Sequence, residues 1–141
     1  MDDLRRAIVV NELTVSHAPQ DDPDSAILMY NLSLALETRF DRTGALEDLA
    51  RAIAMNEQAL ELTSTENPSH PLYLNNLITL LLSRFKNTGL PIDLNHIIMA
   101  HEQAAEQTSP NNHLSLSMYV NNLSNTLYNR FIHMISIMEL S

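Results

Sequence analysis

The chain has 141 residues, is 45% hydrophobic and contains no cysteine, so it can bury one core but has no disulfide framework or thiolate metal site. Its formal net charge of −9 is concentrated in residues 1–69, with 13 acidic residues against 5 arginines, which argues against a nucleic acid partner. The longest apolar run, 77–82, is far shorter than the roughly 20 residues of a membrane span, and no secretory signal is visible, so we expect a cytoplasmic protein without membrane contact.

Apolar residues recur three and four positions apart along the whole chain, which is typical of amphipathic helices. Polar segments that contain proline separate the periodic segments, and Gly44 and Gly89 each follow one of them. No segment alternates cleanly between apolar and polar residues, so no strand is expected. The sequence therefore predicts an all-α fold of about six helices, in the approximate ranges 2–17, 24–41, 46–63, 71–86, 92–108 and 115–133.

The sequence repeats itself at steps of 45 residues, with a final step of 46. The repeated pairs are Asp3-Leu4, Asp48-Leu49 and Asp93-Leu94; Asn31-Leu32, Asn76-Leu77 and Asn122-Leu123; and Arg39-Phe40, Arg84-Phe85 and Arg130-Phe131. A repeat of this length indicates stacked units that cannot bury their apolar faces alone. The connections are short, so consecutive helices should form antiparallel hairpins. In each Arg-Phe pair we expect the ring to pack on the following helix and the arginine to reach solvent or a neighbouring carboxylate.

Several of these motifs together resemble the tetratricopeptide repeats, specifically the longer kinesin-light-chain-like subtype and related arrays of fungal multidomain proteins. The resemblance rests on Asn75-Asn76-Leu77, Arg84-Phe85, Thr88-Gly89, Asp48-Leu49 with Ala52-Ile53, residues 57–62, and His70-Pro71, and it covers residues 2–131. It implies a right-handed α-solenoid of about three repeats that starts in the middle of a repeat. Residues 1–131 would form one repeat domain. Residues 132–141 would be an apolar tail that folds back as a makeshift cap, contacts a partner or aggregates.

The resemblance also implies a concave groove that binds extended peptides. Carried over to this sequence, the groove positions are Tyr30, Asn31, Leu34, Asn75, Asn76, Thr79, Asn121, Asn122 and Asn125. Asparagine offers a donor and an acceptor, so a ladder of carboxamides could pair with a peptide backbone. The alternative is that many of these asparagines only connect adjacent helices by buried hydrogen bonds. None of the nine positions is basic, so we expect a partner of neutral or basic character and not an acidic tail.

Other function classes find little support in the residues. His101-Glu102 lacks the second histidine of a zinc-protease helix, since Ala105 stands there, and His96 lies five positions away on a different side of the helix. His101 is the repeat equivalent of Asn11 and Asn56, which predicts a partly buried polar position between helices. The repeated glutamates form no close acid–base pair, and no phosphate-binding loop is present. We therefore expect no enzyme, no metal and no cofactor.

Two hypotheses follow for the function. The first is a non-catalytic protein-interaction scaffold that binds a peptide or partner segment in the Asn-rich groove. The second is self-assembly, in which exposed terminal helices stack head to tail into a homo-oligomer. In either case the family resemblance suggests a part of a larger multidomain signalling protein.

Overall fold

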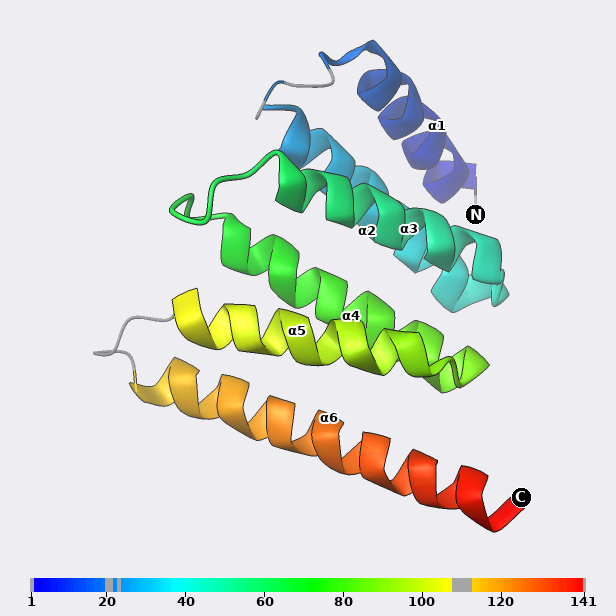
Figure 1. Ribbon diagram of the computed structural model, residues 1–141. Helices are drawn as coiled ribbons and strands as arrows, with labels where there is room; N and C mark the ends of the chain where they lie inside the picture. Colours follow the sequence, from blue (N-terminus) through cyan, green and yellow to red (C-terminus); the bar gives the residue numbers. More distant parts are fainter. Residues whose placement is uncertain (1, 20–21, 23, 108–112, 141) are drawn as a thin grey trace. The chain divides into compact units, whose positions relative to one another are not determined.

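The computed structural model describes residues 2–19, 22, 24–107 and 113–140, and every regular element in these ranges is a helix (Figure 1). The helices are α1 (Asp2–His17), α2 (Ser25–Thr43), α3 (Leu46–Glu61), α4 (His70–Thr88), α5 (Pro91–Gln107) and α6 (His113–Leu140). The predicted all-α class and the packing of consecutive helices are confirmed. The chain divides into two compact units, Met1–Leu80 and Leu81–Ser141. No helix of the described part is long and apolar enough to cross a membrane.

The first unit is built on the antiparallel pair of α2 and α3, with α1 packed on α2 (Figure 1). Leu36, Leu49 and Ala52 have no exposed surface between these helices. The small side chain of Ala52 leaves its carbonyl within reach of α2, and the Ser33 hydroxyl donates a hydrogen bond of 2.9 Å to it. Burial of apolar surface therefore holds the pair together, with one polar contact that fixes the register.

A repeated ion pair closes the turn of the helix hairpins. Arg39 donates from Nε and Nη2 to the two carboxylate oxygens of Asp48, at 2.8 and 2.6 Å. Arg84 and Asp93 form the same contact in the second unit, where Asp93 is fully buried. The hydrogen bond from Arg39 holds the pKa of the Asp48 carboxyl below its usual range. Of the two alternatives for the arginines, the neighbouring carboxylate is confirmed for Arg39 and Arg84. Phe40 is buried as expected, whereas the expected packing is wrong for Phe131, which is 58% exposed.

Glycine ends α2 and α4 because both helices turn through a left-handed residue. Gly44 and Gly89 have φ values of 73° and 69°, and each donates its N–H to the carbonyl of the phenylalanine four residues earlier, at 2.7 Å. A side chain in this conformation crowds the following carbonyl. These two turns therefore allow the next helix to start within a few residues.

Gly44→Ala is expected to lower the free energy of unfolding by about 1–2 kcal/mol. A Cβ atom at this position would meet nothing within 4 Å, so the loss comes from backbone conformation alone. Urea titration followed by circular dichroism measures it. Gly44→Asn should lose less, since asparagine tolerates the left-handed region; equal losses for the two variants would argue against this reason.

The second unit contains the end of α4 together with α5 and α6, and the latter two run antiparallel (Figure 1). Its interior is mainly apolar, with Leu81, Leu94 and Ile97 at most 1% exposed. The ring of Phe85 lies edge-on to the ring of His133, with 5.4 Å between the centroids. This contact attaches the later part of α6 to the end of α4.

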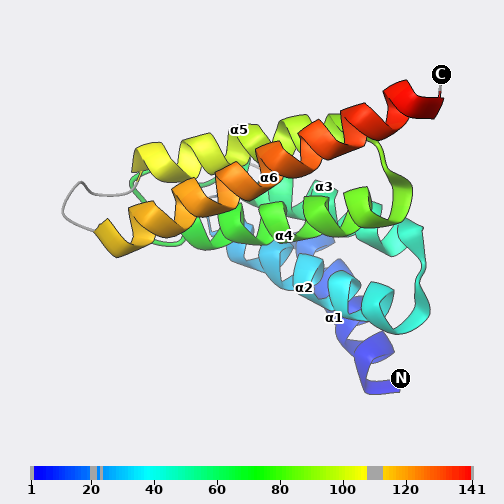
Figure 2. The ribbon, with the colours of Figure 1, turned by 90° about the horizontal axis from the view of Figure 1, so that it is seen from below.

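Residues 132–140 continue α6 in the same direction, as its red end in Figure 2 shows. The position that Gly44 and Gly89 hold in the earlier repeats is occupied by Ile135. A β-branched residue disfavours the left-handed turn, so the helix continues. The segment does not fold back on itself, and Met138 and Leu140 are 71% and 89% exposed.

Candidate interaction surface

A buried carboxamide network connects the helices of the first unit. Asn56 on α3 has no exposed surface, and its Nδ2 donates to the Tyr73 carbonyl on α4 at 2.7 Å. Its Oδ1 accepts a hydrogen bond of 2.9 Å from Asn76 Nδ2, which also lies 3.5 Å from the Ser33 hydroxyl on α2. Asn76 thus joins three helices, and the expected polar position at Asn56 is confirmed.

The rings of Tyr30 and Tyr73 place α2 beside the first part of α4. Their centroids are 4.8 Å apart with an interplanar angle of 44°. Tyr73 is buried within the core cluster of Ala26, Met29 and Ala59, while Tyr30 is half-buried at its edge. Burial, and then the nearby Glu37, raise the pKa of the Tyr30 hydroxyl. The ring pair and the Asn76 contact hold the two helices next to each other.

Next to this network, α2 and the first part of α4 lie side by side (Figure 2). Their exposed side chains form a mixed surface, which we call the α2–α4 face. It consists of Ile27, Asn31 and Leu34 on α2, and Leu72, Asn75 and Thr79 on α4, all of them exposed. The spacing of four and three residues places each set on one side of its helix. Four of the six were predicted from the family resemblance. Ile27 and Leu72 were missed, although they are apolar and 45 positions apart, as the repeat requires.

Two acidic side chains follow this face along α2. Glu37 is half-buried and Asp41 is exposed one helical turn later. Burial, and then the charge of Asp41, raise the pKa of the Glu37 carboxyl. Neither carboxylate forms an ion pair within the part of the chain that the structure describes. The end of the face near these residues therefore attracts positive charge.

The predicted positions in the second unit lie on α6. Asn121, Asn122 and Asn125 are all exposed there. Met118, which is the repeat equivalent of Ile27 and Leu72, is 58% exposed on the same helix. The structure thus places these three asparagines on one helix, while the first six predicted residues lie on two adjacent helices.

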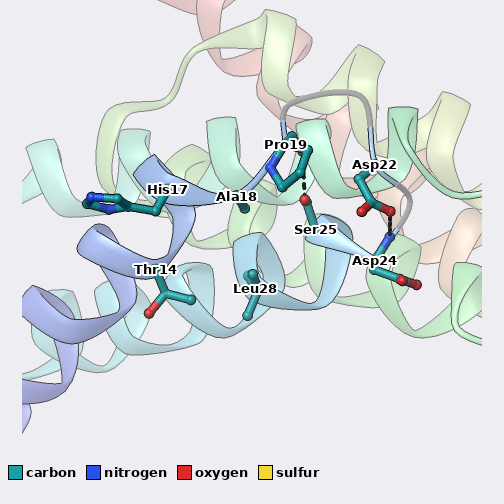
Figure 3. A pocket seen from close by; sticks show the side chains of 8 residues that line it. All are labelled: Thr14, His17, Ala18, Pro19, Asp22, Asp24, Ser25 and Leu28. Carbon is teal, nitrogen blue, oxygen red and sulfur yellow. Dashed lines mark hydrogen bonds between the residues drawn. The ribbon is translucent and has the colours of Figure 1, made fainter.

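A surface pocket of about 360 Å³ lies at the turn between α1 and α2 (Figure 3). Its polar groups stabilise the turn: the Ser25 hydroxyl donates to the Pro19 carbonyl at 2.7 Å, and the Asp24 N–H to Asp22 Oδ1 at 2.9 Å. His17 lies at the opposite end of the pocket from both aspartates. The pocket therefore does not bring an acid and a base together.

His101 is buried on α5 at 3% exposure, and within the described structure its Nδ1 has no hydrogen-bond partner. Burial lowers the pKa of the ring. The described residues contain no group of three side chains that could hold a metal ion. This histidine replaces the asparagine found at Asn56, and it adds a titratable group to the interior.

Stability is expected to fall as the pH is lowered from about 6.5, where a histidine of the unfolded chain titrates. Below that pH the unfolded state binds a proton that the buried His101 does not, and the loss continues until the folded ring itself is protonated. His101→Asn should remove this slope, whereas the exposed His17→Asn should keep it. Unfolding free energies at pH values of about 7.5 and 5.5 test this; an unchanged slope in His101→Asn would contradict it.

Compared with known proteins, the chain matches no protein-family model, no curated protein and no solved structure.

Proposed function

We propose that the chain is a non-catalytic interaction scaffold that binds an extended peptide segment of neutral or basic character on the α2–α4 face. The observation that carries this proposal is the exposed combination of apolar and carboxamide side chains on two helices fixed side by side. We also propose that the chain is cytoplasmic and that its helices form a short array of tetratricopeptide type, with the right-handed sense that the resemblance implies.

The side chains of the face suit a peptide backbone. Asn31 and Asn75 each present a donor and an acceptor, and both are exposed, in contrast to Asn56 and Asn76, which serve the interior. Carboxamides can pair with successive peptide groups of an extended segment whatever its side chains are. Asn121, Asn122 and Asn125 offer the same chemistry on α6. Hydrogen bonds of this kind would supply affinity with little sequence preference.

The apolar members supply anchoring surface. Ile27 and Leu72 are 46% and 49% exposed, and Leu34 is 37% exposed. Covering them removes apolar surface from water, which favours association. A partner segment with an apolar side chain at every second or third position fits this arrangement.

The charge of the partner follows from Glu37 and Asp41 and from the acidic first half of the chain. A lysine or arginine of the peptide would meet two carboxylates within one helical turn, and no basic residue of the described part of the chain is in an ion pair with them. Complementary charge increases the association rate and excludes acidic segments. We therefore propose that a basic side chain of the bound peptide lies near the C-terminal end of α2.

The proposal is tested with short peptides of alternating leucine and lysine, compared with alternating leucine and glutamate, by fluorescence anisotropy. The lysine peptide should bind and the glutamate peptide should not. The double variant Asn31→Ala/Asn75→Ala should weaken binding of the lysine peptide about tenfold or more without changing the melting temperature. Glu37→Gln should also weaken binding of the lysine peptide. Gln58→Ala, exposed on α3, is the matched control. Equal binding of both peptides, or binding unaffected by the double variant, would overturn the proposal.

A further inference from the structure

The pairing of α2 with α3 provides a template that the chain repeats elsewhere in its sequence. On α2 the contact side consists of Ser33, Leu36, Arg39 and Phe40, of which Ser33 and Leu36 have no exposed surface and Phe40 is 8% exposed. On α3 it consists of Asp48, Leu49 and Ala52, all buried. Two polar contacts set the register: Arg39 with Asp48, and the Ser33 hydroxyl with the Ala52 carbonyl.

The equivalents of the α2 side lie on α6 and are uncovered. Ser124, Leu127, Arg130 and Phe131 each follow the α2 residues by 91 positions, the sum of the 45- and 46-residue steps. All four are exposed, and Leu127 and Phe131 reach 45% and 58%. Because Ile135 replaces the turning glycine, α6 continues and the segment after Phe131 does not cover this side.

The equivalents of the α3 side lie on α1 and are also open. Asp3, Leu4 and Ala7 precede the α3 residues by 45 positions; Asp3 and Ala7 are exposed, and Leu4 is half-buried. Among the described residues neither Asp3 nor Arg130 forms an ion pair. The chain therefore presents both halves of one contact, with opposite charges, on two helices far apart in its sequence.

We infer that α1 of one molecule packs on α6 of a second copy as α3 packs on α2, with Arg130 paired to Asp3 and Ser124 donating to the Ala7 carbonyl. A second copy is the occupant because the same chain supplies both complementary sides in matching register, which an unrelated partner would have to reproduce. None of these residues belongs to the α2–α4 face, so the inference goes beyond the proposed function and stands or falls separately from it.

The contact is heterologous, since different surfaces of the two copies meet. Each molecule that docks presents a free α6 or α1 side in turn, so addition continues unless the rotation closes a ring. The expected product is thus a series of sizes that grows with concentration, and not a single dimer.

Light scattering coupled to size exclusion on the 141-residue protein, loaded at about 1 µM to about 1 mM, tests the inference. The average mass should rise with concentration beyond a dimer. Arg130→Asp and Asp3→Arg each place like charges opposite one another and should raise the concentration needed for association about thirtyfold or more. An equimolar mixture of the two variants, and the double variant Asp3→Arg/Arg130→Asp, should both recover association.

Arg5→Asp is the matched control for charge, since it removes the same basic charge from α1 at the repeat equivalent of Ala50, which is exposed in its own repeat. It should associate as the unaltered protein does. Circular dichroism spectra of all variants show whether each one is folded. A monomer over the whole concentration range, or association that the exchanged charges neither weaken nor restore, would overturn the inference.

Discussion

Arg39→Met is expected to lower the free energy of unfolding by about 3–5 kcal/mol at neutral pH, the range found when one partner of a buried ion pair is removed. The side chain of Asp48 is only 8% exposed and receives both of its short hydrogen bonds from Arg39. Without the guanidinium, the carboxylate stays buried without its ion-pair partner and without the hydrogen bonds from Arg39. Urea-induced unfolding followed by circular dichroism measures the loss.

The loss should shrink in acid. In the unaltered protein Arg39 keeps the pKa of Asp48 low, so the stabilisation is complete above the pKa of the unfolded carboxyl and is lost as the pH falls through the lower folded value. In Arg39→Met burial is the largest remaining influence on the pKa of Asp48 and favours the protonated carboxyl, while the charge of Arg51 still favours the ionised form. The two proteins should therefore approach one another in stability below a pH of about 4.

Two further variants separate this effect from the general loss of a charge. Arg51→Met breaks the pair of Arg51 with Glu12, whose side chains are 42% and 39% exposed, and should cost only about 0–1 kcal/mol. Arg39→Met/Asp48→Leu removes both charges and should recover much of the stability. If Arg39→Met lost little unfolding free energy, or if Arg51→Met lost as much as Arg39→Met, the pair of Arg39 with Asp48 would not stabilise the hairpin as described.

The helices could be predicted from sequence because they depend on local spacing, and a neighbouring carboxylate was one of the two alternatives for the repeated arginines. Apolar residues three and four apart define a helix face whatever its surroundings, and Gly44 occupies a conformation that few other residues adopt. The contact of Arg39 with Asp48 spans nine residues across one turn, so its repetition at Arg84 and Asp93 was visible in the repeat. Contacts that form within one helix hairpin recur in the next hairpin, because the residues that make them recur in the sequence.

The surface was harder to predict because neighbouring residues of the same type differ in burial. Asn75 and Asn76 are neighbours in sequence, yet Asn75 is exposed and Asn76 takes part in a network of three helices. The family resemblance implies peptide binding for both, with helix connection as the alternative, and only the rotation of α4 against α2 and α3 separates the two roles. The prediction ended the last helix near residue 133, whereas α6 continues to Leu140. Ile135 stands where the earlier repeats have the glycine that ends the helix.

Asn56→Ala is expected to lower the free energy of unfolding by about 2–4 kcal/mol, because two hydrogen bonds are lost at once. The Tyr73 carbonyl and the Asn76 amide would each lose the hydrogen bond to Asn56, beside a position with no exposed surface. An unsatisfied polar group in such a place costs about 1–3 kcal/mol. Urea titration measures the total, and amide hydrogen exchange on α3 and α4 shows whether the loss is local.

Asn75→Ala is the matched control, since it removes the same carboxamide from an exposed position on α4 and should change stability by no more than about 0.5 kcal/mol. Asn76→Ala should lie between the two, and its effect should be largely absent in the Asn56→Ala background because the shared hydrogen bond is already gone. If the three variants lost equal stability, the asparagines would not divide into interior and surface sets. The α2–α4 face would then have to be defined without the carboxamides, because a residue that contributes as much to folding as Asn56 does cannot be assigned to recognition by loss of binding alone.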